Sequence, residues 1–207
     1  KGHWNLCQSP LLPVTGTPTP GDYCSPFSHE RESAAPGYYQ VFLDRYGVDA
    51  QLSSTLRCAF HKYTYPAGAA ASLLADLQRS NEHVRAWDIR KEGDNVFAGW
   101  QQTGEKMYFY AVANRPVTGI EPVVEGDREV RIVRFGEGDG ALELRIGFSF
   151  VSEENARKNL EAEMLGRSFA AVRSEATAVW NDLLGRIRVE GGTEREKGLF
   201  YSCLYRS

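Results

Sequence analysis

Residues 95–116 read NVFAGWQQTGEKMYFYAVANRP and contain two short runs of apolar and aromatic residues, 95–101 and 107–113. The turn-forming residues Thr103-Gly104-Glu105 separate the two runs. Short runs of this composition that end at Gly, Asn or Pro are typical of β-strands. We therefore expect two antiparallel strands here. Their aromatic residues are expected in the core and in cross-strand pairs rather than on a binding platform.

Similar runs extend in both directions from this segment at intervals of roughly ten residues, which is typical of an all-β sandwich. About nine or ten strands are too many for one flat sheet, so the sequence predicts a mainly β fold with two packed antiparallel sheets. The glycine-rich residues 136–140 are expected to form a hairpin turn between two of the strands. The runs are 38–43, 48–57, 59–65, 71–77, 83–89, 95–101, 107–113, 117–124, 129–135 and 142–150.

Toward the C-terminus the hydrophobic period changes from 2 to 3.6, which predicts helices. Ser152 is a candidate N-cap for a short first helix. A clearer second helix begins at Ser168 and carries Trp180 on its apolar stripe, where we expect Trp180 to anchor the helix against the sandwich. Thr193 and Glu196 fit the capping box of a third helix. Strands followed by helices indicate a β domain that leads into a helical one.

Composition excludes several classes of function. The 207-residue chain has a net charge of −3 and no cluster of Lys and Arg, which argues against a nucleic-acid partner. No apolar stretch approaches the ~20 residues of a membrane-spanning helix. The chain has no initiator Met and ends within a predicted helix, so we expect it to be a piece of a larger protein. No nucleophile elbow is present, and no catalytic residue is predicted in this chain.

Four cysteines, Cys7, Cys24, Cys58 and Cys203, contain no C-x-x-C spacing, which argues against a zinc or thioredoxin-like site. Two interpretations of them remain open. Cys7 and Cys24 bracket a Pro/Thr/Gly-rich loop that a disulfide could hold, as is common in secreted proteins. Alternatively the thiols are free, with Cys58 and Cys203 as buried side chains.

Five stretches, in order from residue 27 to the end, carry a resemblance to a known family. They are FSHE (27–30) with PGYYQV (36–41), AQLSST (50–55) with FHKYTYP (60–66), GFSFVS (147–152) with ARKNLE (156–161), WNDLL (180–184), and FYSCLYR (200–206). Together these stretches resemble the N-terminal part of glycoside hydrolase family 92. Each motif alone is a weak signal, whereas five in register are specific. The first 26 residues match poorly.

The resemblance implies a calcium-dependent exo-α-mannosidase that removes terminal α-linked mannose, with α-1,2 as the expected linkage, from glycans with inversion. It implies a sandwich joined by helices to an (α/α) barrel. The barrel would carry the catalytic carboxylates, beyond Ser207, and would be the main binding site of the calcium ion. We therefore expect an N-terminal β-sandwich over residues 1–151, loop-rich and substrate-side over 1–37. Residues 152–207 are expected to form a helical linker and the start of the catalytic domain. The implied partners are a mannose-containing glycan and the protein's own barrel, and the implied location is secreted, periplasmic or cell-surface.

Four residues are the predicted substrate contacts. His3 and Trp4 precede the sandwich, where a Trp could stack on a pyranose ring or merely cover a sheet edge. His29 and Glu30 follow Ser28 in a loop and could bind sugar hydroxyls or form a local latch on backbone N–H groups. No metal ligand is predicted, because calcium needs 6–8 oxygen ligands and no Asp/Asn-rich loop is present.

Two other functions are carried as alternatives. An autonomous carbohydrate-binding sandwich would bind sugar without a catalytic partner. A purely structural sandwich would only support the barrel. The apolar face predicted for the third helix argues against the autonomous module, because an isolated module has no use for a helix that must bury one side.

Overall fold

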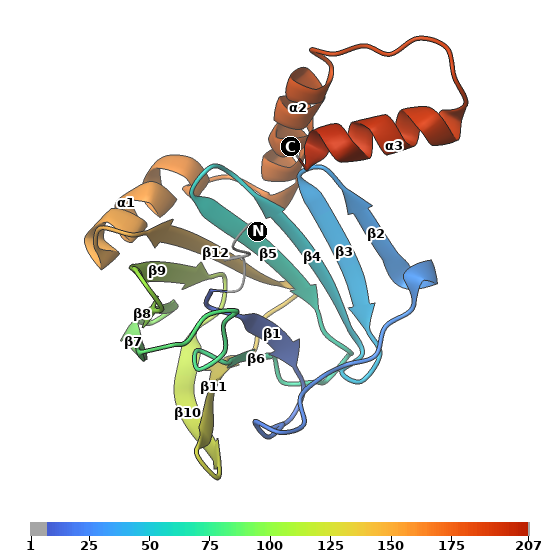
Figure 1. Cartoon of the computed structure of the whole chain (residues 1–207). Helices are drawn as coiled ribbons and strands as arrows, with labels where there is room; N and C mark the ends of the chain where they lie inside the picture. The colour runs from blue at the N-terminus through green and yellow to red at the C-terminus, as the bar shows by residue number, and fades with distance from the viewer. Residues whose placement is uncertain (1–7, 207) are drawn as a thin grey trace.

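A computed structural model describes residues 8–206 of the chain, and these residues form twelve strands and three α-helices (Figure 1). The strands are β1 (Leu11–Val14), β2 (Glu32–Ala35), β3 (Tyr38–Leu43), β4 (Val48–Ser54), β5 (Cys58–Thr64), β6 (Ser72–Ala75), β7 (Ala86–Gly93), β8 (Val96–Gln102), β9 (Lys106–Ala113), β10 (Val117–Glu125), β11 (Arg128–Phe135) and β12 (Leu142–Ser149). The helices are α1 (Glu153–Met164), α2 (Phe169–Leu184) and α3 (Glu194–Tyr205), and a short 3-10 helix, η1, spans His29–Arg31.

Two antiparallel sheets form the sandwich. The smaller sheet has the strand order β1-β6-β11-β10, and the larger has the order β2-β3-β4-β5-β12-β9-β8-β7. Their inner faces share one apolar core to which both sheets contribute. The predicted mainly β sandwich followed by helices is therefore confirmed.

Strand β9 shows how the sequence pattern produces this core. Successive side chains of a strand point to opposite faces of the sheet. Phe109 and Ala111 are buried between the sheets, whereas Tyr108 and Tyr110 lie half-buried on the outer face. Phe97 of β8 extends the buried set, since its ring packs edge-on against that of Phe109. The alternating burial along this strand is thus what divides core from surface.

The prediction of a hairpin turn at residues 136–140 is wrong. This segment joins β11 to β12, and the two strands belong to different sheets. β11 instead pairs with β10 and β6, and β12 pairs with β5 and β9. The glycines therefore lie in a crossover between the layers of the sandwich, because pairing partners far away in the sequence, and not the turn, decide the sheet.

Segment 1–37 contains more regular structure than the expected loops. Within its described part, β1 pairs with β6 and β2 pairs with β3. β1 has only four residues, too few for a visible period, and it includes Pro13. Proline has no N–H for a ladder, so it is tolerated at a sheet edge, which is where β1 lies.

Helices α1 and α2 cover the outer face of the larger sheet and form a second apolar core there. The predicted N-caps are confirmed, since Ser152 accepts a hydrogen bond from Asn155 N and Thr193 forms a complete capping box with Glu196. A carboxylate fixes the far end of α1, because Glu163 accepts hydrogen bonds from Thr55 Oγ1 at 2.5 Å and from the Arg57 side chain at 2.6 Å. The second core consists of Tyr38, Cys58, Phe60, Leu160, Met164, Phe169 and Val172.

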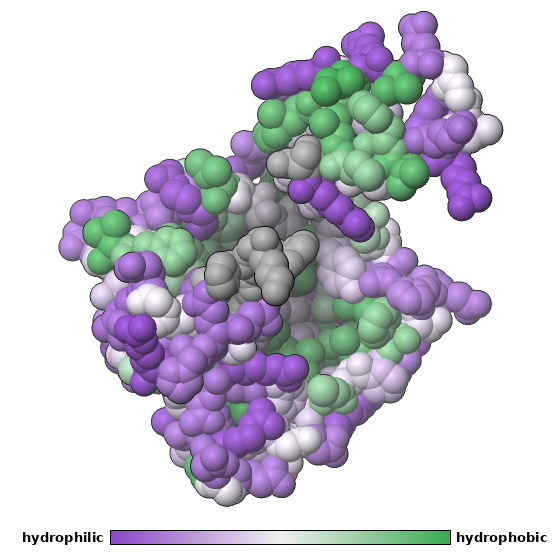
Figure 2. All heavy atoms as spheres, in the orientation of Figure 1, coloured by the Kyte–Doolittle hydropathy of each residue, from purple (hydrophilic) through white to green (hydrophobic). Residues whose placement is uncertain are grey.

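Helices α2 and α3 carry an exposed apolar surface at their end of the molecule (Figure 2). Val179 and Leu199 are 50% and 66% exposed. Trp180, expected to anchor α2 against the sandwich, lies edge-on to Tyr205 of α3, with 4.7 Å between ring centroids. No helix within residues 8–206 is long and apolar enough to cross a membrane. The apolar side of this helix pair is thus left uncovered by the rest of the described chain.

Three of the four cysteines lie within the described residues. Cys24 and Cys203 are exposed free thiols, and Cys58 is a buried free thiol. Cys7 lies outside the described residues. The structure therefore agrees with the free-thiol interpretation for Cys58, whereas Cys203, expected on a buried helix face, is exposed.

Candidate functional site

His29 and Glu30 lie in η1, at the edge of the larger sheet next to β2. Ser28 is the N-cap of this short helix, and its Oγ accepts a hydrogen bond from the Glu30 backbone N at 3.2 Å. The carboxylate of Glu30 forms no hydrogen bond or ion pair with any other residue between 8 and 206. Glu30 is therefore free to contact a ligand, while its backbone is held in place.

His29 is part of a hydrogen-bonded chain with Glu32 and Tyr39. His29 Nδ1 lies 2.5 Å from Glu32 Oε2, and the Tyr39 hydroxyl donates to Glu32 Oε1 at 2.6 Å. The hydrogen bond from Tyr39, followed by that from His29, lowers the pKa of the Glu32 carboxyl. Burial, reinforced by this carboxylate, raises the pKa of Tyr39 to about 12. These contacts keep Glu32 charged and link His29, through Glu32, to Tyr39 of β3.

A hollow of about 330 Å³ lies at the sheet edge, beside the hydrogen-bonded residues Glu32 and Tyr39. Its lining includes Glu30, Arg31, Gln40 and Asp49. The Arg31 guanidinium lies over the Phe42 ring at 3.2 Å and pairs with Asp44 at 3.3 Å. Carboxylate, amide and guanidinium groups together provide both acceptors and donors for hydroxyl groups. The geometry can therefore hold a polyhydroxy ligand, although the same contacts also make a local latch.

The predicted residues His3 and Trp4 lie outside the described residues. The described part of the chain begins beside the C-terminal end of β8. Gln8 Nε2 donates to Thr103 Oγ1 at 3.3 Å, and Ser9 N donates to Gln101 Oε1 at 2.8 Å. Ser9 has φ 50°, a left-handed conformation that is uncommon outside glycine, and the buried Gln101 helps to hold it.

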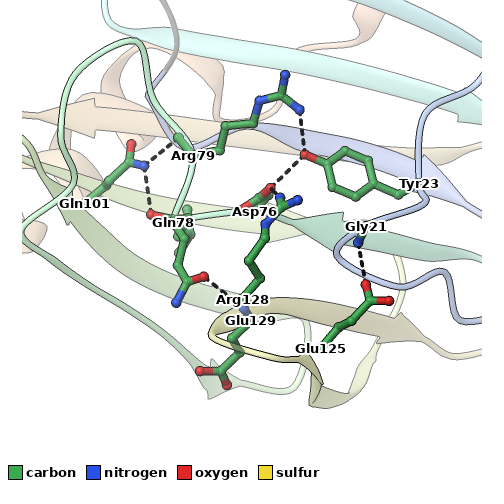
Figure 3. Close-up of polar contacts among 10 residues, drawn as sticks. Gly21, Tyr23, Asp76, Gln78, Arg79, Gln101, Glu125, Arg128 and Glu129 are labelled. Atoms are coloured by element: carbon green, nitrogen blue, oxygen red, sulfur yellow. Dashed lines mark hydrogen bonds and ion pairs between the residues drawn. The ribbon is translucent and has the colours of Figure 1, made fainter.

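A second polar cluster, missed in the sequence, surrounds Asp76 (Figure 3). Asp76 is 2% exposed, and its Oδ2 accepts from the Tyr23 hydroxyl at 2.7 Å and from Arg128 at 3.2 Å. Arg79 also donates to the Tyr23 hydroxyl at 3.0 Å. Burial and the hydrogen bond to Asp76 raise the pKa of Tyr23. The only available signal was a carboxylate at the end of the apolar run 71–77.

The described residues do not fit a metal site. No group of three or more His, Cys, Asp or Glu side chains converges anywhere from residue 8 to 206. Asp76 Oδ1 is buried without a hydrogen-bond partner, but the Asp76 carboxylate already pairs with Arg128. A calcium ion needs 6–8 oxygen ligands, which this environment does not offer.

Comparisons with known proteins place this geometry in a family. A model described as the glycosyl hydrolase family 92 N-terminal domain matches residues 1–159. A second model, described as the family 92 catalytic domain, matches residues 155–207. The two matches follow one another along the chain and meet at α1.

The individual relatives share about a quarter of their aligned residues with this chain. An uncharacterized secreted glycosidase from Arthroderma benhamiae is 24% identical over 215 residues, covering 84% of this chain and 28% of the relative. A family GH92 α-mannosidase structure from Bacteroides thetaiotaomicron has a TM-score of 0.86 at 24% identity, covering 97% of this chain and 32% of that one. A family GH92 inverting mannosidase from the same organism has a TM-score of 0.82 at 26% identity, covering 95% and 29%.

The chain thus spans less than one third of the length of these relatives. The N-terminal family model nevertheless covers most of it, and the sandwich with its following helices has the same fold as the solved structures. On this basis the chain belongs to glycosyl hydrolase family 92.

Proposed function

We propose that this chain is the N-terminal domain, with the first helices of the catalytic domain, of an exo-acting α-mannosidase. The observation that carries the proposal is the succession of the two family 92 models along one chain, from sandwich to helices. The names of the structural relatives, an α-mannosidase and an inverting mannosidase, support α-linked mannose as the substrate and inversion as the outcome. We take the cleaved mannose to be the terminal one. We take the linkage to be α-1,2.

The proposed division assigns residues 1–151 to the sandwich and residues 152–207 to the helical linker and the start of the catalytic domain. The uncovered apolar side of α2 and α3 supports this division, because such a surface needs a partner to remove it from water. In this proposal the partner is the protein's own catalytic barrel.

Inverting hydrolysis uses two carboxyl groups about 6.5–9.5 Å apart, one acting as general acid and the other activating a water. Many acidic side chains of the described residues are paired with arginine or lysine, and we assign none of them to catalysis. We place both catalytic carboxylates in the barrel. The sandwich then contributes pocket geometry, where an error of ~1 Å can reduce the rate about 100-fold.

Within the sandwich we propose that His3, Trp4, His29 and Glu30 contact substrate. For Glu30 the support is the polar hollow that it lines and its unpaired carboxylate, and His29 is its neighbour in η1. The hydrogen-bonded chain from His29 to Tyr39 favours a second candidate role, in which this edge only braces the sheet. Variants of Glu30 separate the two roles, because Glu30 takes no part in the hydrogen bonds that link His29, Glu32 and Tyr39.

We propose calcium as the metal of the whole enzyme on the basis of the family alone. Because residues 8–206 offer no fitting ligand set, we place the ion mainly in the barrel. A secreted, periplasmic or cell-surface location is also proposed, supported by the relative named as a secreted glycosidase.

The decisive experiment measures mannose release from an α-1,2-linked manno-oligosaccharide. The present chain is compared with the same protein extended through the catalytic domain, each with calcium and with a chelator. Release only by the extended protein, and only with calcium, is expected. Absence of release by a folded extended protein would show that the proposed substrate is wrong.

A further inference from the structure

An open pocket of about 660 Å³ lies between the loop that follows β6 and the turn that joins β10 to β11. Its walls include Glu82, His83, Arg85 and Trp87 on one side and Asp127 and Arg128 on the other. None of these residues belongs to the hollow at His29 and Glu30. The β10–β11 turn lies at the opposite end of the molecule from α2 and α3 (Figure 1).

The loop wall of this pocket is held from the inside by Gln101. The side chain of Gln101 is fully buried, and its amide donates to the backbone carbonyls of Leu77 at 2.9 Å and Arg79 at 3.0 Å. Its carbonyl oxygen accepts from Ser9 N, so the carbonyl and both amide hydrogens have partners. A fully satisfied buried amide of this kind fixes the loop in one conformation.

The two walls are also tied to each other (Figure 3). Arg128 pairs with the buried Asp76 at 3.2 Å, and Gln78 Oε1 accepts from the backbone N of Glu129 at 2.8 Å. Asp76 and Gln78 belong to the β6 side, whereas Arg128 and Glu129 begin β11. The separation of the walls is therefore set by contacts inside the protein and needs no ligand.

The side chains that face the pocket behave differently from the groups behind it. Those of Glu82, His83, Arg85 and Asp127 form no hydrogen bond or ion pair with any other residue in the described part of the chain. A rigid frame that presents several unpaired polar groups is the arrangement of a preformed binding site.

The lining also defines the chemical class of the ligand. Arg128 is already neutralised by Asp76, so the charges left facing the pocket are Arg85 against Glu82 and Asp127, a balance that disfavours an anion. The mixture of donors and acceptors suits hydroxyl groups, which both donate and accept. Trp87 adds an aromatic surface of the kind that packs on the C–H groups of a sugar ring.

We propose that this pocket binds a pyranose unit of a neutral glycan. The choice of mannose as the sugar rests on the proposed function. The pocket itself rests on the contacts of Gln101 and Asp76 and on the unpaired side chains in front of them.

The test is a titration of α-1,2-mannobiose into the ¹⁵N-labelled chain, followed by amide chemical shifts. Saturable shifts are expected at residues 82–87 and 127–128. Arg85→Ala removes a charged hydrogen-bond partner and is expected to weaken binding about tenfold. Arg85 is exposed, so this variant keeps the fold. Arg186→Ala, an exposed arginine of the helical end, is the matched control and is expected to bind like the unmodified chain.

Shifts that fail to saturate, or saturable shifts confined to residues 29–42, would overturn the inference. So would equal affinity of the Arg85→Ala and Arg186→Ala variants. Mannose release by the extended protein is measured separately. Release without binding at this pocket removes the inference and leaves the mannosidase proposal intact, whereas binding without release does the reverse.

Discussion

Gly147 of β12 lies directly against the backbone of Ala156 in α1, so that a Cβ atom on Gly147 would be 2.2 Å from the Ala156 carbonyl oxygen. Leu160 N would be 3.0 Å away. Both obstacles are helix backbone and cannot turn aside as a flexible side chain could. The absence of a side chain at residue 147 therefore sets how closely α1 approaches the sheet.

Gly147→Ala is expected to push α1 away from the sheet and to lower the free energy of unfolding by about 1–3 kcal/mol, the usual cost of overpacking. Denaturant unfolding followed by circular dichroism measures this change. Gly104→Ala is the control, because nothing lies within 4 Å of a Cβ at that position. Equal stability of the two variants would contradict the close approach.

The Cys58 thiol is predicted to resist alkylation in the folded chain. Burial, together with the nearby Glu163 carboxylate, raises the pKa of Cys58 to about 12, so almost no reactive thiolate exists at pH 8. Cys24 and Cys203 are exposed and are expected to react first. Iodoacetamide labelling with peptide mass mapping measures the order. Labelling of Cys58 as fast as Cys203 under native conditions would show that the second core is open.

His61 is predicted to make stability depend on pH. Burial lowers its pKa from the ordinary value of 6.5 to about 4, and the Tyr63 hydroxyl lies 2.7 Å from its Nδ1. The imidazole is neutral in the folded state, whereas in the unfolded state it protonates as the pH falls below 6.5. Its contribution is therefore fully present above pH 6.5 and declines as the pH falls toward 4, by on the order of 2 kcal/mol at pH 5.

Unfolding measured at pH 7.5 and pH 5.0 checks this prediction, with His61→Gln as the variant that lacks the titrating group. The loss of stability between the two pH values should be smaller in His61→Gln. A histidine NMR titration in the folded chain gives an independent result, and a His61 pKa near 6.5 would contradict the prediction.

The sequence was sufficient to predict local structure but not the pairing of distant segments. Alternation in residues 107–113 and the caps at Ser152 and Thr193 are local signals, so the strand and the helices were predicted correctly. The crossover at residues 136–140 was missed because its neighbouring strands pair with partners elsewhere in the chain. The same reason hid Asp76, whose partners Tyr23 and Arg128 come from distant segments.

Glu30→Ala in the extended protein is predicted to raise KM about tenfold for an α-1,2-linked manno-oligosaccharide, as expected when a charged hydrogen-bond partner of the ligand is lost. The melting temperature should not change, because the Glu30 carboxylate has no partner among residues 8–206. Glu32→Ala is the comparison, since it breaks the contacts with His29 and Tyr39 and should lower the melting temperature as well. If Glu30→Ala leaves KM unchanged while Glu32→Ala impairs both properties, this edge acts as a brace and does not contact the glycan.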